Sequence, residues 1–165
     1  MASRPRHSAA SKVHPARHKD AVQRILDRGA DSFVVSFVLP WPSSALSPNT
    51  YAHHHYKARQ KKAYRAEIGA EVLEQMLLMP TPVRIPDGDL ALHLFFVRPT
   101  YRHCDLDNLI ARMKAGIDGM CDALRIDDRR FKSLSGKLAA WTEQPACVIV
   151  DITQLDEKKN GNEGV

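Results

Sequence analysis

The chain lacks the features that mark secreted and membrane proteins. It has three cysteines in 165 residues, with no Cys-x-x-Cys spacing, which argues against a disulfide framework or a structural zinc site. Its longest apolar stretch, residues 33–41, is far too short to cross a bilayer, and residues 1–30 lack the apolar centre of a secretory signal. We therefore expect a cytoplasmic protein with reduced cysteines, no membrane contact and no small-molecule cofactor.

The charge of the chain is unevenly distributed. The formal net charge is +5, and residues 1–30 carry seven Lys or Arg against two Asp, so the remainder is neutral. We expect a basic leader at 1–30 that is disordered or folds along DNA phosphates, one domain at 31–154, and a polar tail at 155–165. Within the domain a basic block at 57–65 is followed by six aspartates at 105–128. Such segregation suits a protein that holds a polyanion beside a metal site.

Hydrophobic periodicity predicts the elements of this domain. Alternation predicts strands at 32–39, 89–97 and 147–153, and a further strand after a loop within 129–143, containing Leu138, Ala140 and Trp141. Spacings of three and four predict helices at 56–79 and from residue 106 to 124. The expected apolar face of the first helix is Ala63, Ala66, Ala70, Leu73, Met76 and Leu77. The order predicts an α+β fold, a small mixed sheet of about four strands with two main helices packed on it.

The basic block recurs at helical spacing on another face of the first helix. Lys57, Lys61 and Arg65 are four residues apart, and Arg59 and Lys62 flank them. A charged stripe is often only solvated surface, but no glutamate offsets these cations before Glu67. A DNA backbone would supply the counter-charge. Three histidines precede the helix at 53–55; because adjacent imidazoles cannot easily converge on one ion, we expect His54 to contact DNA rather than zinc.

Acidic residues lie at both ends of the second helix. The sequence Asp-Leu-Asp-Asn occupies 105–108, and an Asp-Asp pair occupies 127–128. Helix capping or a turn would explain either group alone. Their combination favours a site for Mg²⁺ or Mn²⁺, which prefer carboxylate oxygens. Asp107 and Asp118 are eleven positions apart, about 16 Å along a helix, so they cannot share an ion. Asp128 can join Asp105 and Asp107 only if the chain turns back antiparallel to the helix.

Several short motifs together resemble the RusA-type Holliday junction resolvases of bacteria and their prophages, most closely the phage-type branch. The resemblance runs from about residue 33 to 152. Its markers are Leu-Pro-Trp-Pro at 39–42, Ser-Pro-Asn at 47–49, the basic block, Asp-Leu-Asp-Asn at 105–108, Gly-Ile-Asp-Gly at 116–119, Asp-Ala-Leu at 122–124 and Ile-Asp-Asp at 126–128. It implies a homodimer that binds four-way junction DNA in recombination and repair and nicks two strands symmetrically with magnesium or manganese.

Residue roles follow from the resemblance. It implies that Asp105, Asp107 and Asp128 are catalytic metal ligands, with Asp127 as a neighbour that binds or orients. The family often has a lysine four residues after the second aspartate; here that position is Ala111, and Lys114 on the same helical side is the candidate replacement. The candidate DNA-binding residues are Lys57, Arg59, Lys61, Lys62, Arg65, Asn49, His54 and Arg112.

Two other functions remain open from the sequence. The first is a structure-specific DNA-binding protein of the same fold that cleaves weakly, because the family lysine is missing at Ala111. The second is an unrelated metal-dependent phosphohydrolase of small phosphate esters, which leaves the basic stripe without a role. Steep salt dependence of DNA binding separates the second from the others.

Overall fold

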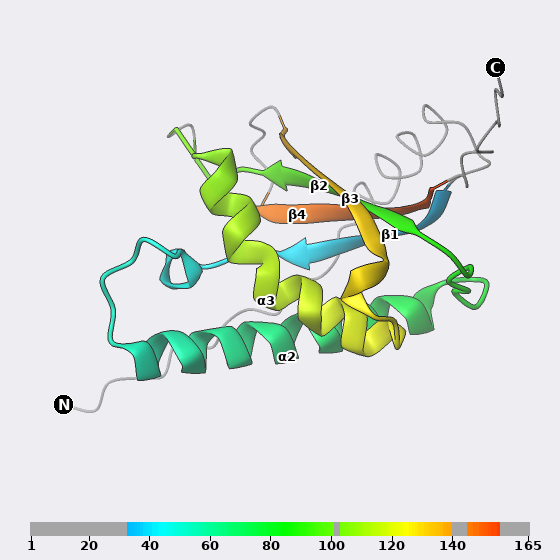
Figure 1. Ribbon diagram of the computed structural model, residues 1–165, viewed down its shortest axis with the longest axis horizontal. Coiled ribbons are helices and arrows are strands. Elements are labelled where there is room, and N and C mark those ends of the chain that lie inside the picture. The colour runs from blue at the N-terminus through cyan, green and yellow to red at the C-terminus, as the bar shows by residue number, and fades with distance from the viewer. Residues whose placement is uncertain (1–32, 101–102, 140–144, 156–165) are drawn as a thin grey trace, which may run out of the picture.

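The computed structural model of the chain describes residues 33–100, 103–139 and 145–155 (Figure 1). The expected leader at 1–30 and nearly all of the expected tail lie outside these residues. The elements, in chain order, are β1 (Phe33–Pro40), the 3₁₀ turn η1 (Ser44–Leu46), α2 (His54–Leu78), β2 (Leu90–Val97), α3 (Leu106–Leu124), the 3₁₀ turn η2 (Asp128–Arg130), β3 (Phe131–Leu138) and β4 (Cys147–Gln154). None of the described helices is long and apolar enough to span a bilayer.

The four strands form one mixed sheet in the order β1-β4-β2-β3. The central strand β4 is antiparallel to both β1 and β2, whereas β3 is parallel to β2. A parallel pair needs a crossover connection, and α3 supplies it between β2 and β3. Both helices lie on the same side of the sheet (Figure 1). The predicted α+β fold with two main helices on a small mixed sheet is confirmed.

The core lies between the two helices and the sheet face that they cover. Alternate strand residues point into it in register, as Phe37, Val150 and Leu94 do across β1, β4 and β2. The helix α3 contributes Leu109 and Met113, which are almost completely buried. The predicted alternation of β1 and of most of β2 thus corresponds to burial on the face covered by helices, whereas β4 is buried on both faces.

The core-facing side of α2 differs from the prediction. Tyr64, Ile68 and Val72 are buried, whereas the expected face from Ala63 to Leu77 is largely exposed, with only Met76 of that set partly buried. Both sets have helical spacing, so periodicity could not choose between them. The side chain of Gln75 fixes the observed orientation: it accepts from the Val38 N–H at 3.0 Å and donates to the Val38 carbonyl at 2.7 Å, at the free edge of β1.

The third strand begins earlier than predicted. A loop was expected from residue 129, but β3 starts at Phe131 and ends at Leu138. Most side chains of this edge strand are exposed, and its polar residues Lys132, Ser133, Ser135 and Gly136 show no apolar alternation. The strand is fixed by its ladder with β2 rather than by burial. The predicted strand residues Ala140 and Trp141 lie outside the described part of the chain.

Glycines allow α2 and α3 to cross closely. A Cβ on Gly119 would overlap the backbone carbonyl of Arg65, and one on Gly116 would lie 2.8 Å from Cε1 of Tyr64. These two glycines of α3 therefore permit a close approach to α2. The Tyr64 hydroxyl donates to the Pro40 carbonyl at 2.9 Å, which ties the crossing to the end of β1.

We predict that Gly119→Ala destabilises the protein by about 1–3 kcal/mol, because overpacking at a backbone contact forces the helices apart. At an ordinary helical position the same change stabilises by roughly 1 kcal/mol, so the sign of the effect is diagnostic. Urea unfolding followed by circular dichroism measures it. A stabilised variant would contradict the close crossing.

Candidate functional site

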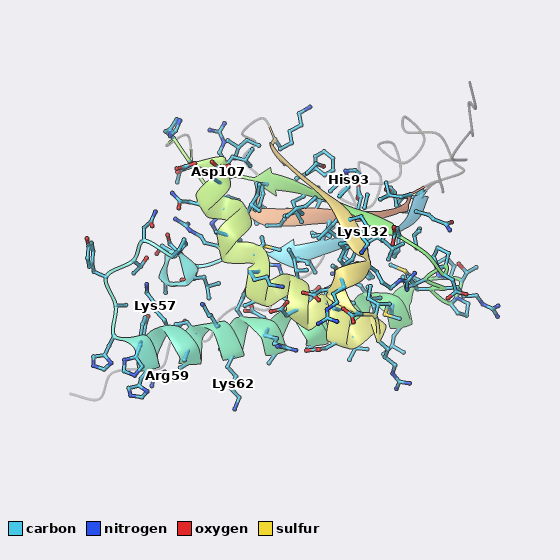
Figure 2. All side chains as sticks on the ribbon, viewed as in Figure 1. Lys57, Arg59, Lys62, His93, Asp107 and Lys132 are labelled. Atoms are coloured by element: carbon cyan, nitrogen blue, oxygen red, sulfur yellow. The ribbon has the colours of Figure 1, made fainter. Side chains whose placement is uncertain are left out.

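The first carboxylate group lies at the beginning of α3. Asp105 is the N-cap: its Oδ1 accepts from the Asp107 N–H at 3.2 Å, and its Oδ2 accepts from Asn108 Nδ2 at 3.0 Å. Asn108 Oδ1 in turn accepts from Asn49 Nδ2 at 3.1 Å. Asp107 is exposed in the first helical turn (Figure 2). The motif at 105–108 therefore caps the helix, and Asn49 contacts the motif and holds Asn108 in place.

The second carboxylate group lies at the other end of α3. Lys114 Nζ donates to Asp118 Oδ1 at 2.8 Å and to Asp128 Oδ2 at 2.7 Å. Arg65 of α2 makes a bidentate ion pair with Asp122, at 2.7 and 2.8 Å. These residues line an open depression of about 400 Å³ together with Cys121, Ile126 and Asp127. This end of the helix thus concentrates carboxylates around two cations.

One chain does not bring the two carboxylate groups to one ion. Lys114 holds Asp128 beside Asp118, and Asp118 lies eleven residues after Asp107, about 16 Å along the helix. The chain does turn back after α3, as β3, but Asp128 precedes that strand in η2 and stays at the far end. Ligand oxygens on one magnesium ion lie about 2.1 Å from it. Asp105 and Asp107 therefore cannot share an ion with Asp128 of the same chain.

A cationic groove lies between η1, α2 and α3. It has a volume of about 550 Å³, and its wall includes the predicted Lys57, Lys61, Lys62, Arg65, Arg112 and Lys114. The remaining lining residues are Leu46, Ser47, Pro48, Ala111, Ala115 and Asp118. The stripe of α2 and the middle of α3 thus face one groove. Ala111 and Arg112 are about one helical turn past Asn108, so the groove begins near the first carboxylate group and ends at Asp118 of the second.

The groove cations differ in the partners that they have. Lys57 Nζ donates to the Pro48 carbonyl at 3.2 Å, while Arg65 and Lys114 are held by aspartates. Nε of Arg112 is buried and has no hydrogen-bond partner. Lys61 and Lys62 have no ion pair among the described residues. Three cations are therefore available for an external anion.

Three predicted DNA-binding residues lie outside the groove wall: Asn49, which contacts Asn108, and Arg59 and His54. The guanidinium of Arg59 lies over the ring of Tyr56, with Cζ 5.7 Å from the ring centroid, on the opposite side of α2 from the Lys57 side chain (Figure 2). His54 is exposed in the first turn of α2. The structure does not bring Arg59 or His54 to the groove cations.

The ion pairs of α3 shift the pKa of their members. Hydrogen bonding to Asp118 and Asp128 raises the pKa of Lys114, and its ammonium lowers the pKa of Asp128. Hydrogen bonding to Arg65 lowers the pKa of Asp122. Burial, reinforced by the negative charge of Asp128, raises the pKa of Cys121 to about 12, so this thiol stays protonated at neutral pH. Both aspartates are ionised at neutral pH and Lys114 is charged.

The three histidines before α2 come closer together than expected. One ring nitrogen of each of His53, His54 and His55 lies within 4.8 Å of the others. Among the described residues, these three side chains are close enough together to hold a metal ion. His53 is extended at the N-cap and the other two start the helix, so the rings stack, with centroids 3.8–5.6 Å apart. The sequence argument that adjacent imidazoles cannot easily converge on one ion does not hold here, although all three side chains are exposed and the helix dipole opposes a cation at this end.

Sequence reasoning gave no site role to Asp118 or Asp122. Asp118 is one turn after Lys114, a spacing that signals an ion pair. No sequence signal pairs Asp122 with Arg65, because that contact depends on where two distant helices cross.

Comparison with known proteins finds a similar protein whose description names no activity. No protein-family model matches the chain. A protein of Xylella fastidiosa (strain Temecula1), described as uncharacterized, is 43% identical over 103 residues, which cover 59% of this chain and 63% of the relative. The chain thus spans less than two thirds of that protein's length.

The two ion pairs give a testable pKa pattern. We predict that Lys114→Gln raises the pKa of Asp128 toward the ordinary value of 3.8 and leaves Asp122 unchanged, and that Arg65→Gln does the reverse. Carboxyl ¹³C NMR titration measures both residues at once. Because each pKa is depressed in the folded state, the stabilisation is present above the ordinary value and disappears as the pH falls through the folded one. Equal shifts of both aspartates in either variant would contradict the separate pairs.

Proposed function

We propose that the protein is a magnesium- or manganese-dependent endodeoxyribonuclease that resolves four-way DNA junctions as a homodimer. The observation that carries the proposal is the groove of about 550 Å³, walled by six cations and flanked on α3 by a carboxylate group at each end. A groove of this charge suits a phosphate backbone, since neutralised phosphates release counterions. The branched substrate and the paired nicks come from the motif resemblance.

The available cations of the groove support a polyanionic ligand. Lys61 and Lys62 are exposed, and the buried Nε of Arg112 is a donor without an acceptor. The Arg112 side chain lines the groove, and guanidinium groups suit phosphate well. A hydrolase for small phosphate esters needs no such extended set of cations, so the groove favours DNA over that alternative.

The metal ligands of this proposal come from two copies of the chain. Asp105 and Asp107 of one protomer would hold the ion together with Asp128 of the partner, because one chain keeps these groups about 16 Å apart. Asn108 and Asn49 would orient Asp105, as outer-sphere residues orient ligands in metal sites. A bound Mg²⁺ polarises the scissile phosphate and lowers the pKa of a bound water.

Lys114 is the proposed replacement for the family lysine missing at Ala111. Its ammonium lies 2.7 Å from Oδ2 of Asp128 and lines the same groove, so it would stand beside the scissile phosphate and offset its developing negative charge. The alternative function, junction binding with weak cleavage, rests on the ion pairs that already hold this lysine to Asp118 and Asp128.

The composite site predicts complementation between inactive variants. Asp107→Asn and Asp128→Asn should each abolish junction cleavage while leaving junction binding intact. When the two proteins are mixed and exchange subunits, each mixed dimer has one intact site, so we expect about a quarter of the wild-type nicking rate. A gel assay with a labelled four-way junction measures it.

Two controls make this experiment decisive. A mixture of Asp105→Asn with Asp107→Asn should stay inactive, because both changes affect the same protomer's half of the site. Native mass spectrometry should report subunit exchange in both mixtures. Exchange without recovery in the first mixture would contradict the composite site, and cleavage by either single variant would contradict its metal role.

The position of the groove predicts that two cations of α2, Lys61 and Arg59, contribute differently to DNA affinity. Lys61→Gln should weaken junction binding and reduce the slope of log affinity against log salt by about one. Arg59→Gln removes the same charge outside the groove and should leave both quantities nearly unchanged. Fluorescence anisotropy at several salt concentrations measures the pair. Equal effects of the two variants would contradict binding in the groove.

A further inference from the structure

The helix α2 has a second apolar face that the fold leaves exposed. This face contains the residues first expected in the core, and within it they are spaced by three, four, three and four: Ala63, Ala66, Ala70, Leu73 and Leu77. Leu73 is 50% exposed and Leu77 is 86% exposed. The chain's own core takes Tyr64, Ile68 and Val72 on the other side. The helix is therefore apolar on two sides and buried on one.

The spacing of this face suits another helix. Repeats of three and four residues form the seam between paired helices, in which side chains of one fit between those of the other. Single exposed leucines are common, but a continuous row along 15 residues is not. The middle of the row is also hollowed: a depression of about 400 Å³ is lined by Ala66, Gly69, Ala70 and Leu73, with Gly119 and Ala123 of α3. Small residues there permit a helix to approach closely.

The charges of α2 favour a second copy of the same helix. Its cations, Lys57, Arg59, Lys61, Lys62 and Arg65, all precede its acids, Glu67, Glu71 and Glu74. An antiparallel copy places the basic half beside the partner's acidic half, whereas a parallel copy places like charges together. In antiparallel register centred between Ala66 and Ala70, Ala63 meets Leu73 of the partner subunit. Leu73 then faces a small side chain, and Leu77 lies opposite Arg59 of the partner subunit.

We propose that α2 pairs antiparallel with α2 of a second chain through the face formed by Ala63, Ala66, Ala70, Leu73 and Leu77, and that this pairing forms the homodimer. The inference rests on the proposed function in one respect: it takes the α2 pair to be the homodimer named there. The pairing itself can be measured without DNA or metal. Lys62 and Arg65 line both this depression and the cationic groove. Pairing therefore places the grooves of the two copies next to each other.

Sedimentation equilibrium of the full chain tests the pairing. We expect the wild-type protein to sediment at twice the chain mass and Leu73→Glu to sediment as a monomer with an unchanged far-ultraviolet circular dichroism spectrum. The matched control is Leu134→Glu, which changes a leucine of 49% exposure on β3 and should stay dimeric. A monomeric wild type, or a dimeric Leu73→Glu, would overturn the proposal.

The salt dependence of dimerisation tests the antiparallel orientation of the two α2 helices. Antiparallel pairing of unlike charges predicts a dimer dissociation constant that rises between about 50 mM and 500 mM salt, because screening weakens the attraction. A constant that falls over this range would overturn the antiparallel arrangement. Cleavage does not enter either measurement, so an inactive dimer would count against the nuclease proposal and leave the pairing intact.

Discussion

The close crossing of α2 and α3 at Gly119 brings the cations of α2 beside the charged residues of α3. Because the Arg65 carbonyl occupies the space where a Cβ of residue 119 would be, the two helix axes approach closely at this point. The contact puts the Arg65 guanidinium against Asp122 and opens the cationic groove on one side of the crossing. The apolar depression that includes Gly69 and Leu73 adjoins the same crossing. The cationic groove, the Arg65–Asp122 ion pair and the apolar depression thus all adjoin one backbone contact.

The length of α3 determines how the carboxylates can act. The helix has 19 residues, and Asp118, which shares Lys114 with Asp128, lies eleven residues after Asp107, about 16 Å along the helix. Each end is satisfied locally: Asp105 caps the helix, and Asp128 is held by Lys114. Neither group needs a metal for the fold. A site that uses both must draw on a second chain, which is why we connect catalysis to a dimer.

The sequence was sufficient for most of the fold because most of its elements bury one face. Alternation in β1 and β2 and the apolar face of α3 correspond to burial, whereas β4 is buried on both faces. Prediction from the sequence was wrong for the start of β3 and for the core face of α2. The polar edge strand β3 was placed too late because its ladder with β2 uses backbone groups that leave no side-chain pattern. The core face of α2 was misassigned because the helix has two apolar faces.

For the candidate site, sequence patterns identified residue types better than their arrangement. The stripe from Lys57 to Arg65 and the helix residues Arg112 and Lys114 do line one groove. The bond between Asn49 and Asn108 joins two motifs 59 residues apart, a contact that only the folded chain reveals. Spacing already separated Asp107 from Asp118, but the position of Asp128 depended on how far the chain turns back after α3. The chain reverses from Arg125 onward, and this brings Asp128 back only as far as Lys114 and Asp118.

The central claim is that the groove and its flanking carboxylates cut branched DNA. The most direct measurement compares a labelled four-way junction with a linear duplex of matched sequence, each incubated with the wild-type protein and Mg²⁺, Mn²⁺ or EDTA. Our account predicts paired nicks at symmetric positions in the junction, none in the duplex, and none with EDTA. Tight junction binding without nicks under any of these conditions, or equal cleavage of the duplex, would contradict it.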